Sequence, residues 1–111
     1  MAFEHKTETE ARQQILDMVA EYCDTYHNKK GPFQEGDRIP YASRVYDHKE
    51  MVNLVDSSLE FWLTSGRYTD EFEKKLADYL GVRFCSLVNS GSSANLVALS
   101  LIHISEPTRR S

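Results

Sequence analysis

Cysteine is scarce in this chain of 111 residues, which has two, Cys23 and Cys85. They stand far apart and lack the close spacing of metal ligands, which argues against a zinc or iron–sulfur site within the chain. We predict instead that each is a small buried hydrophobic residue. The histidines are scattered too, with no pair at the i, i+4 spacing of a helix. The sequence therefore assigns no metal ligand and no catalytic residue.

A basic excess and a long apolar run are also lacking. The formal net charge is −4, whereas nucleic-acid-binding domains are usually basic. No stretch approaches the roughly 18 apolar residues of a membrane span, and the N-terminus around Glu4 and Lys6 has no signal-peptide core. We therefore expect a soluble cytoplasmic protein without a nucleic-acid or membrane partner, and the length suits one small domain.

Apolar residues recur at helical spacing in three stretches. The first runs from Thr9 to about Tyr26. The second runs from about His48 to Leu63, begins with a capping box between Asp47 and Glu50, and is predicted to stop at residues 64–66. The third follows an expected N-cap at Thr69, buries a stripe of its apolar residues, and ends at Gly81 in the left-handed C′ position. The buried stripe comprises Phe72, Leu76, Tyr79 and Leu80.

Residues 27–46 are different, because glycine and proline interrupt any periodicity there. This segment is either a surface linker or an arm that docks on a partner subunit, and composition does not choose between them.

An apolar run from Arg83 to Val88 then reads as a strand buried on both faces, and a further helix follows it. The order helix, strand, helix predicts the α/β class.

A polar turn, Asn89 to Asn95, separates this strand from the last helix. Free backbone N–H groups and the helix dipole favour an anion at such a turn, and Gly91 allows a close approach while the serine hydroxyls add donors. No Asp or Glu occurs from Tyr79 through Ser105, so no nearby carboxylate in the sequence repels a phosphate. The alternative is an ordinary serine-capped helix.

Four segments together resemble a known family, the DegT/DnrJ/EryC1/StrS sugar aminotransferases and dehydrases. In order along the chain, they supply the four features of the family's pattern: a glycine-containing turn, a helix with Phe-Glu, a Tyr-Leu-Gly helix end and a Ser-Gly turn after a strand. The segments are Trp62–Thr69, Phe72–Leu76, Tyr79–Val82 and Asn89–Asn95. The amino-acid sequence of these segments looks most like the CDP-4-dehydro-6-deoxyglucose 3-dehydrase branch, which acts in the biosynthesis of lipopolysaccharide deoxysugars. The resemblance implies the N-terminal part of a fold type I transferase that depends on pyridoxal phosphate.

Residue by residue, the resemblance places Gly91, Ser92 and Ser93 at the phosphate of pyridoxal or pyridoxamine phosphate. It places Arg67 and Tyr68, beside Gly66, near the nucleotide-sugar substrate at a dimer interface. In the dehydrase branch a histidine replaces the cofactor-binding lysine, and a [2Fe-2S] cluster receives electrons from an NADH-dependent reductase. Those groups are expected downstream of this region, so the resemblance implies an incomplete site, a homodimeric parent enzyme and no turnover by this stretch alone.

The resemblance stops at Ala98, and residues 99–111 look like the translation of a transposase-type sequencing-library adapter. We therefore divide the chain into an N-terminal helix and arm (1–46), the start of the large domain (47–98) and a non-native tail (99–111). Two alternatives to the dehydrase stay open. One is an aminotransferase of the same family, and whether the residue facing the cofactor is lysine or histidine would decide between it and the dehydrase. The other is a non-enzymatic helical interaction domain.

Overall fold

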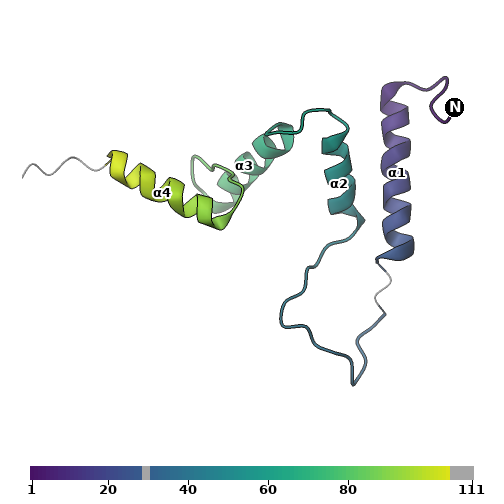
Figure 1. The fold of residues 1–111 in the computed structure, drawn as a ribbon, viewed down its shortest axis with the longest axis horizontal. Helices are drawn as coiled ribbons and strands as arrows, with labels where there is room; N and C mark the ends of the chain where they lie inside the picture. The colour runs from purple at the N-terminus through teal and green to yellow at the C-terminus, as the bar shows by residue number, and fades with distance from the viewer. Residues whose placement is uncertain (29–30, 106–111) are drawn as a thin grey trace, which may run out of the picture. The chain divides into compact units, whose positions relative to one another are not determined.

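The computed structural model describes residues 1–28 and 31–105, which form helices α1 (Glu8–Tyr26), α2 (His48–Ser58), α3 (Arg67–Leu80) and α4 (Gly91–Ser105) (Figure 1). The chain separates into two compact units, one up to Thr64 and one from Ser65. The first unit contains α1 and α2, and the second contains α3 and α4. Residues 106–111 of the predicted tail lie outside the described residues.

Helix α1 starts at a capping box that local sequence specifies. The Thr7 hydroxyl accepts from the Glu10 N–H at 3.3 Å, and the Glu10 carboxylate accepts from the Thr7 N–H at 2.9 Å. Both bonds satisfy first-turn donors that the helix itself leaves without a partner. The predicted helix is confirmed, and Cys23 is buried as expected, with 5% of its surface exposed.

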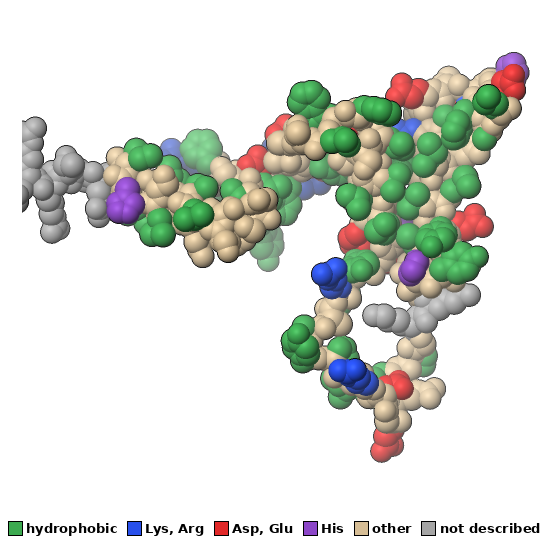
Figure 2. Space-filling model, viewed as in Figure 1, with side chains coloured by type: hydrophobic (Ala, Val, Ile, Leu, Met, Phe, Trp, Pro, Cys, Tyr) green, Lys and Arg blue, Asp and Glu red, His purple; other side chains and the backbone are tan. Residues whose placement is uncertain are grey.

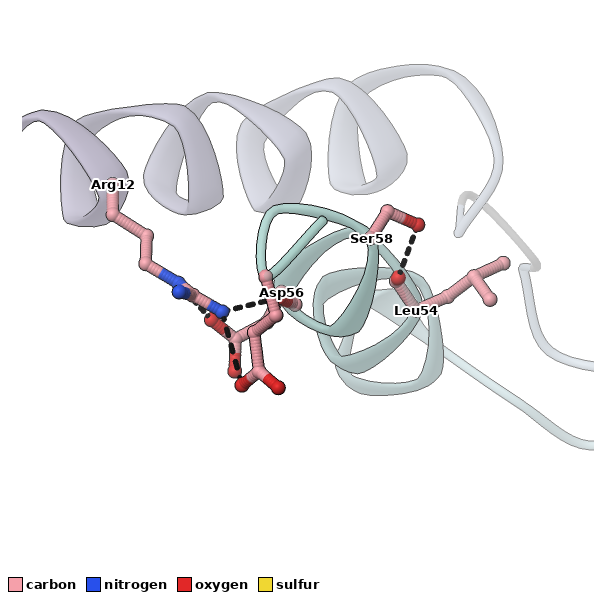
Figure 3. Close-up of polar contacts among 5 residues, drawn as sticks. Arg12, Leu54, Asp56 and Ser58 are labelled. Atoms are coloured by element: carbon pink, nitrogen blue, oxygen red, sulfur yellow. Dashed lines mark hydrogen bonds and ion pairs between the residues drawn. The ribbon is translucent and has the colours of Figure 1, made fainter. Parts of the chain in front are cut away.

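Helix α2 confirms the predicted capping box. The Asp47 carboxylate accepts from the Lys49 N–H, and the Glu50 carboxylate accepts from the Asp47 N–H, both at 2.8 Å. The predicted end near Leu63 is wrong, because α2 ends at Ser58. There the Ser58 hydroxyl donates to the Leu54 carbonyl at 2.9 Å (Figure 3), a contact that bends helices, and Phe61 has a left-handed φ of 57°.

The Asp47 cap predicts an acid-sensitive start of α2. The hydrogen bond from the Lys49 N–H lowers the pKa of Asp47 below its ordinary value of 3.8. Because the folded pKa is the lower one, the cap's stabilisation is fully present above pH 3.8 and is lost as the pH falls through the folded pKa. We expect hydrogen exchange at Lys49, corrected for its intrinsic pH dependence, to accelerate in that range.

The variant Asp47→Asn is the control for this prediction, since an amide oxygen caps a helix without titrating. Its corrected exchange rate at Lys49 should stay flat over the same acid range. An acid-induced acceleration of equal size in Asp47→Asn would contradict a titrating cap.

A charged contact joins α1 to α2 in the first unit. Arg12 of α1 donates from Nε to Asp56 Oδ1 at 2.6 Å, and its Nη2 donates to the Asp56 carbonyl and approaches Glu60 Oε1 at 3.4 Å (Figure 3). All three side chains are partly shielded, with 16% to 28% of their surfaces exposed. From one position on α1, the guanidinium fork therefore reaches Asp56 in the last turn of α2 and Glu60 just beyond the end of α2.

In the second unit, α3 begins three residues before the expected start. Its N-cap is Gly66, so the predicted cap at Thr69 is wrong and Arg67 and Tyr68 are helical rather than part of a connection. The predicted end is confirmed: Gly81 has a φ of 69°, and its N–H donates to the Asp78 carbonyl at 3.2 Å. Glycine suits this position because a Cβ in the left-handed region is strained.

The predicted strand over residues 83–88 is not formed, so the α/β class is not confirmed for the residues that the structure describes. No ladder of backbone hydrogen bonds joins this segment to another among residues 1–28 and 31–105. A strand requires a neighbouring segment to pair its N–H and C=O groups.

The predicted burial is also wrong, since Phe84 is 85% exposed and Cys85 is only half-buried.

Most large apolar side chains remain exposed in both units (Figure 2). Among the described residues, only Cys23 and Ala77 are buried apolar residues. The predicted stripe of α3 shows the same pattern, because Phe72, Tyr79 and Leu80 are 47% to 85% exposed. The helices have their apolar faces, but the packing that would cover those faces is largely lacking.

Candidate functional site

The serine turn places a helix N-terminus directly after the extended segment. Helix α4 begins at Gly91, so Ser90 occupies the capping position. The Ser90 hydroxyl accepts from the Ser93 N–H at 3.1 Å and contacts the Ser93 hydroxyl at the same distance. The Ser90 carbonyl accepts the Ala94 N–H at 3.0 Å. This arrangement is a serine N-cap of the ordinary kind, the alternative that the sequence left open.

Two backbone donors at this turn have no protein partner among the described residues, the N–H groups of Gly91 and Ser92. The backbone at Gly91 is also uncrowded, because a Cβ built there would meet nothing within 4 Å. Free first-turn N–H groups and the positive end of the helix dipole are the groups that hold a phosphate. The arrangement therefore fits an anion of phosphate size at Gly91 and Ser92.

Ser93 differs from its neighbours, because Ser90 already occupies its N–H. An anion would have to displace the Ser90 hydroxyl to use that donor, while the Ser93 hydroxyl could still rotate toward it. The serine cap left open by the sequence is thus Ser90, and a serine directly before a Gly-Ser-Ser helix start is its recognisable signal.

A carboxylate from α3 reaches the segment that precedes the turn. Glu73 Oε2 accepts from the Leu87 N–H at 2.8 Å, fourteen residues further along the chain. The contact joins the middle of α3 to a residue three positions before Ser90. No sequence pattern predicts this contact, since Glu73 resembles any other acidic residue on an exposed helix face.

Arg67 and Tyr68 lie side by side in the first turn of α3. The Arg67 guanidinium carbon lies 4.3 Å from the centre of the Tyr68 ring, which is cation–π geometry. Arginine combines this stacking with a planar guanidinium fork whose geometry suits phosphate oxygens. The pair thus has the chemistry to bind a phosphorylated ligand.

Metal-binding clusters of three or more ligands and membrane-spanning helices are both absent from the residues that the structure describes. No group of three or more His, Cys, Asp or Glu side chains there could hold a metal ion. No helix in those parts of the chain is both long and apolar enough to cross a bilayer.

Comparison with known proteins gives the turn its context. The family model described as the DegT/DnrJ/EryC1/StrS aminotransferase family matches residues 45–109. This range includes all four motif segments. It also extends past Ala98, to residue 109.

Three relatives of the chain are similar to it in sequence. The chain is 41% identical over 97 residues to the lipopolysaccharide biosynthesis protein RfbH of Salmonella typhimurium, covering 86% of this chain and 22% of that protein. It is 36% identical to dTDP-4-dehydro-2,6-dideoxy-D-glucose 3-dehydratase of Saccharopolyspora spinosa, with 82% and 20% covered. It is 33% identical to GDP-4-keto-6-deoxy-D-mannose 3-dehydratase of Yersinia pseudotuberculosis, with 58% and 16% covered.

The chain spans about a fifth of the length of the first two relatives. The family match nevertheless covers more than half of the chain, and the motif segments lie within it. The chain belongs to the DegT/DnrJ/EryC1/StrS aminotransferase family.

Proposed function

We propose that this chain forms the phosphate-binding corner of an enzyme that uses pyridoxal or pyridoxamine phosphate on a nucleotide-linked 4-keto-6-deoxyhexose. The observation that carries the proposal is the start of α4, where the Gly91 and Ser92 N–H groups lack a protein partner within the described residues. The family membership supplies the identity of the anion, since these enzymes depend on pyridoxal phosphate. No acidic residue lies within ten positions of Gly91 on either side to oppose its charge.

In this proposal each residue at the turn has a definite task. Gly91 and Ser92 donate their backbone N–H groups to phosphate oxygens, and the Ser92 and Ser93 hydroxyls add donors. When bound, the cofactor supplies an electron sink for bond breaking next to the sugar's C4 carbon. The serine turn holds its phosphate and thereby orients its ring.

Arg67 and Tyr68 are proposed to contact the nucleotide sugar. An arginine suits the diphosphate of such a substrate, because its N–H groups bind two phosphate oxygens at once. Because Arg67 is already stacked on Tyr68, its side chain loses less conformational entropy when it binds the substrate.

Among members of the family, we favour C3 dehydration in deoxysugar biosynthesis for the parent enzyme. Two of the relatives above are named as 3-dehydratases of nucleotide-linked deoxysugars. The CDP-linked substrate, the homodimer, the reductase and the [2Fe-2S] cluster are predictions for the whole enzyme, and none rests on a residue described here. An aminotransferase is the alternative, as the family description indicates.

The phosphate-binding proposal predicts a local response to inorganic phosphate and to pyridoxal phosphate. In NMR titrations of the 111-residue chain, the Gly91 and Ser92 amides should shift most. A carboxylate introduced by Ser92→Asp would occupy these donors and repel the anion, so we expect binding to weaken by about tenfold or more. Unchanged Gly91 and Ser92 amides at millimolar phosphate would contradict the proposal.

The matched control is Ser100→Asp. It adds the same charge to an exposed position of the same helix, about 12 Å further along its axis at 1.5 Å per residue. Phosphate affinity in Ser100→Asp should stay near that of the parent chain. An equal loss in both variants would mean that net charge, not the turn, governs binding.

A helical interaction domain is the second candidate, and one feature of the first unit favours it. An open, mostly apolar groove of about 1300 Å³ lies along α1, residues 43–47 and α2. Met18, Tyr22, Val45 and Met51 line it, and each is at least 39% exposed. Exposed apolar grooves of this kind often bind other proteins. A folded chain whose turn amides ignore both phosphate probes would favour this second function.

A further inference from the structure

We propose that Glu73 is a positioning residue for the serine turn, acting through the backbone of Leu87. The inference rests on the proposed phosphate-binding function and names the residue that sets the location of the turn. The contact that carries it is the hydrogen bond from the Leu87 N–H to Glu73 Oε2 at 2.8 Å. A charged acceptor makes this bond stronger than one between neutral groups.

The segment between α3 and α4 has few other attachments. At its start, the Val82 N–H donates to the Ala77 carbonyl at 3.0 Å, as part of the helix cap. Further along, no strand ladder fixes residues 83–88 within the described chain. The Leu87 anchor therefore determines where the backbone enters the turn, and Ser90, only three residues later, carries the cap of α4.

The position of Glu73 separates it from the other acids of α3. Glu71 pairs with Lys75 on the same helix, and this contact lowers the pKa of Glu71. Glu73 instead reaches a backbone donor outside α3, and its residue is half-buried. Through this contact, Glu73 links α3 to the segment that leads into the serine turn. Helix α3 begins with Arg67 and Tyr68.

Three variants of the 111-residue chain test this role. Glu73→Ala removes the acceptor, Glu73→Gln keeps an acceptor oxygen without the charge, and Glu71→Ala is the control on the same helix. In Glu73→Ala we expect exchange at Leu87 to accelerate and phosphate affinity at Ser92 to fall, each by about three- to tenfold. Glu71→Ala should leave both values unchanged.

Glu73→Gln distinguishes positioning from simple charge. If Glu73 positions the turn, glutamine keeps more of the Leu87 protection than alanine does, and Glu73→Gln binds phosphate more tightly than Glu73→Ala. If Glu73 acted only by repelling the anion, both Glu73→Ala and Glu73→Gln would bind phosphate more tightly, and the proposal would be overturned.

The failure of the two proposals can be told apart. Exchange at Leu87 and the chemical shift of the Ser93 amide report the anchor without any ligand. If both stay unchanged in Glu73→Ala, the positioning role is overturned, whatever the phosphate result. If both change while the parent chain ignores phosphate and pyridoxal phosphate, the positioning of the turn is supported and the phosphate-binding function fails.

Discussion

Replacing Cys23 by aspartate is expected to release α2 from α1. Cys23 is the one buried residue of α1, with 5% of its surface exposed, and it lines the groove with Met51 and Val55 of α2. An ionised carboxylate there would lose its hydration without a cationic partner, at a cost on the order of 3 kcal/mol. With so little other buried surface in the first unit, we expect the protection of the α2 amides from hydrogen exchange to be abolished.

Two further variants calibrate this result. Cys23→Ser introduces a neutral hydroxyl into the same site and should cost about 1 kcal/mol, so that α2 keeps part of its protection. Thr25→Asp adds the same charge to an exposed position in the same last turn of α1, where it is equally unfavourable to the helix dipole. If Thr25→Asp abolished protection in α2 as fully as Cys23→Asp, burial at Cys23 would not be the cause.

The start of α2 and the end of α3 could be predicted because the determining features are local. The capping box of Asp47 and Glu50 needs only residues three positions apart, and it is present. The left-handed Gly81 depends on the conformational freedom of a single residue. The end of α2 depended instead on the back-bonded Ser58 and the left-handed Phe61, which its apolar periodicity does not reveal.

Burial and strand formation could not be predicted in the same way, because they depend on neighbours. The apolar run at residues 83–88 has strand character, but a strand forms only beside another segment. Phe84 and Cys85 therefore remain exposed or half-buried despite their hydrophobicity. The pattern defines which faces can pack, and the available partners decide which faces do.

The candidate site follows the same division. Serine and glycine at residues 90–93 indicated an anion-binding helix start, and α4 does begin there. Which donors are occupied could not be read from the sequence, because it depends on the rotamer of Ser90. The contact of Glu73 with Leu87 could not be predicted for another reason. It joins residues fourteen positions apart, and no periodic pattern connects them.

Arg12 provides the second large expected effect. In Arg12→Met the apolar stem is kept, but Asp56 and Glu60 lose the cation that bridges them to α1. Because the pairs are partly shielded, we expect the free energy of unfolding of the helix pair to fall by about 1–2 kcal/mol. Hydrogen exchange of the α2 amides measures this loss. Arg12→Lys should fall in between, since one ammonium cannot reproduce the three contacts of the guanidinium fork.

A double-mutant cycle with Asp56→Asn separates the ion pair with the Asp56 carboxylate from the other contacts of Arg12. If the pair carries the effect, Arg12→Met should cost less in the Asp56→Asn background than in the parent chain. Gln13→Met is the matched control, because Gln13 is exposed and its amide donates to Asp17 within α1 at 2.9 Å. It should leave α2 unaffected, since that contact ends on the same helix. Additive losses in the cycle would show that the Asp56 carboxylate does not carry the effect of Arg12.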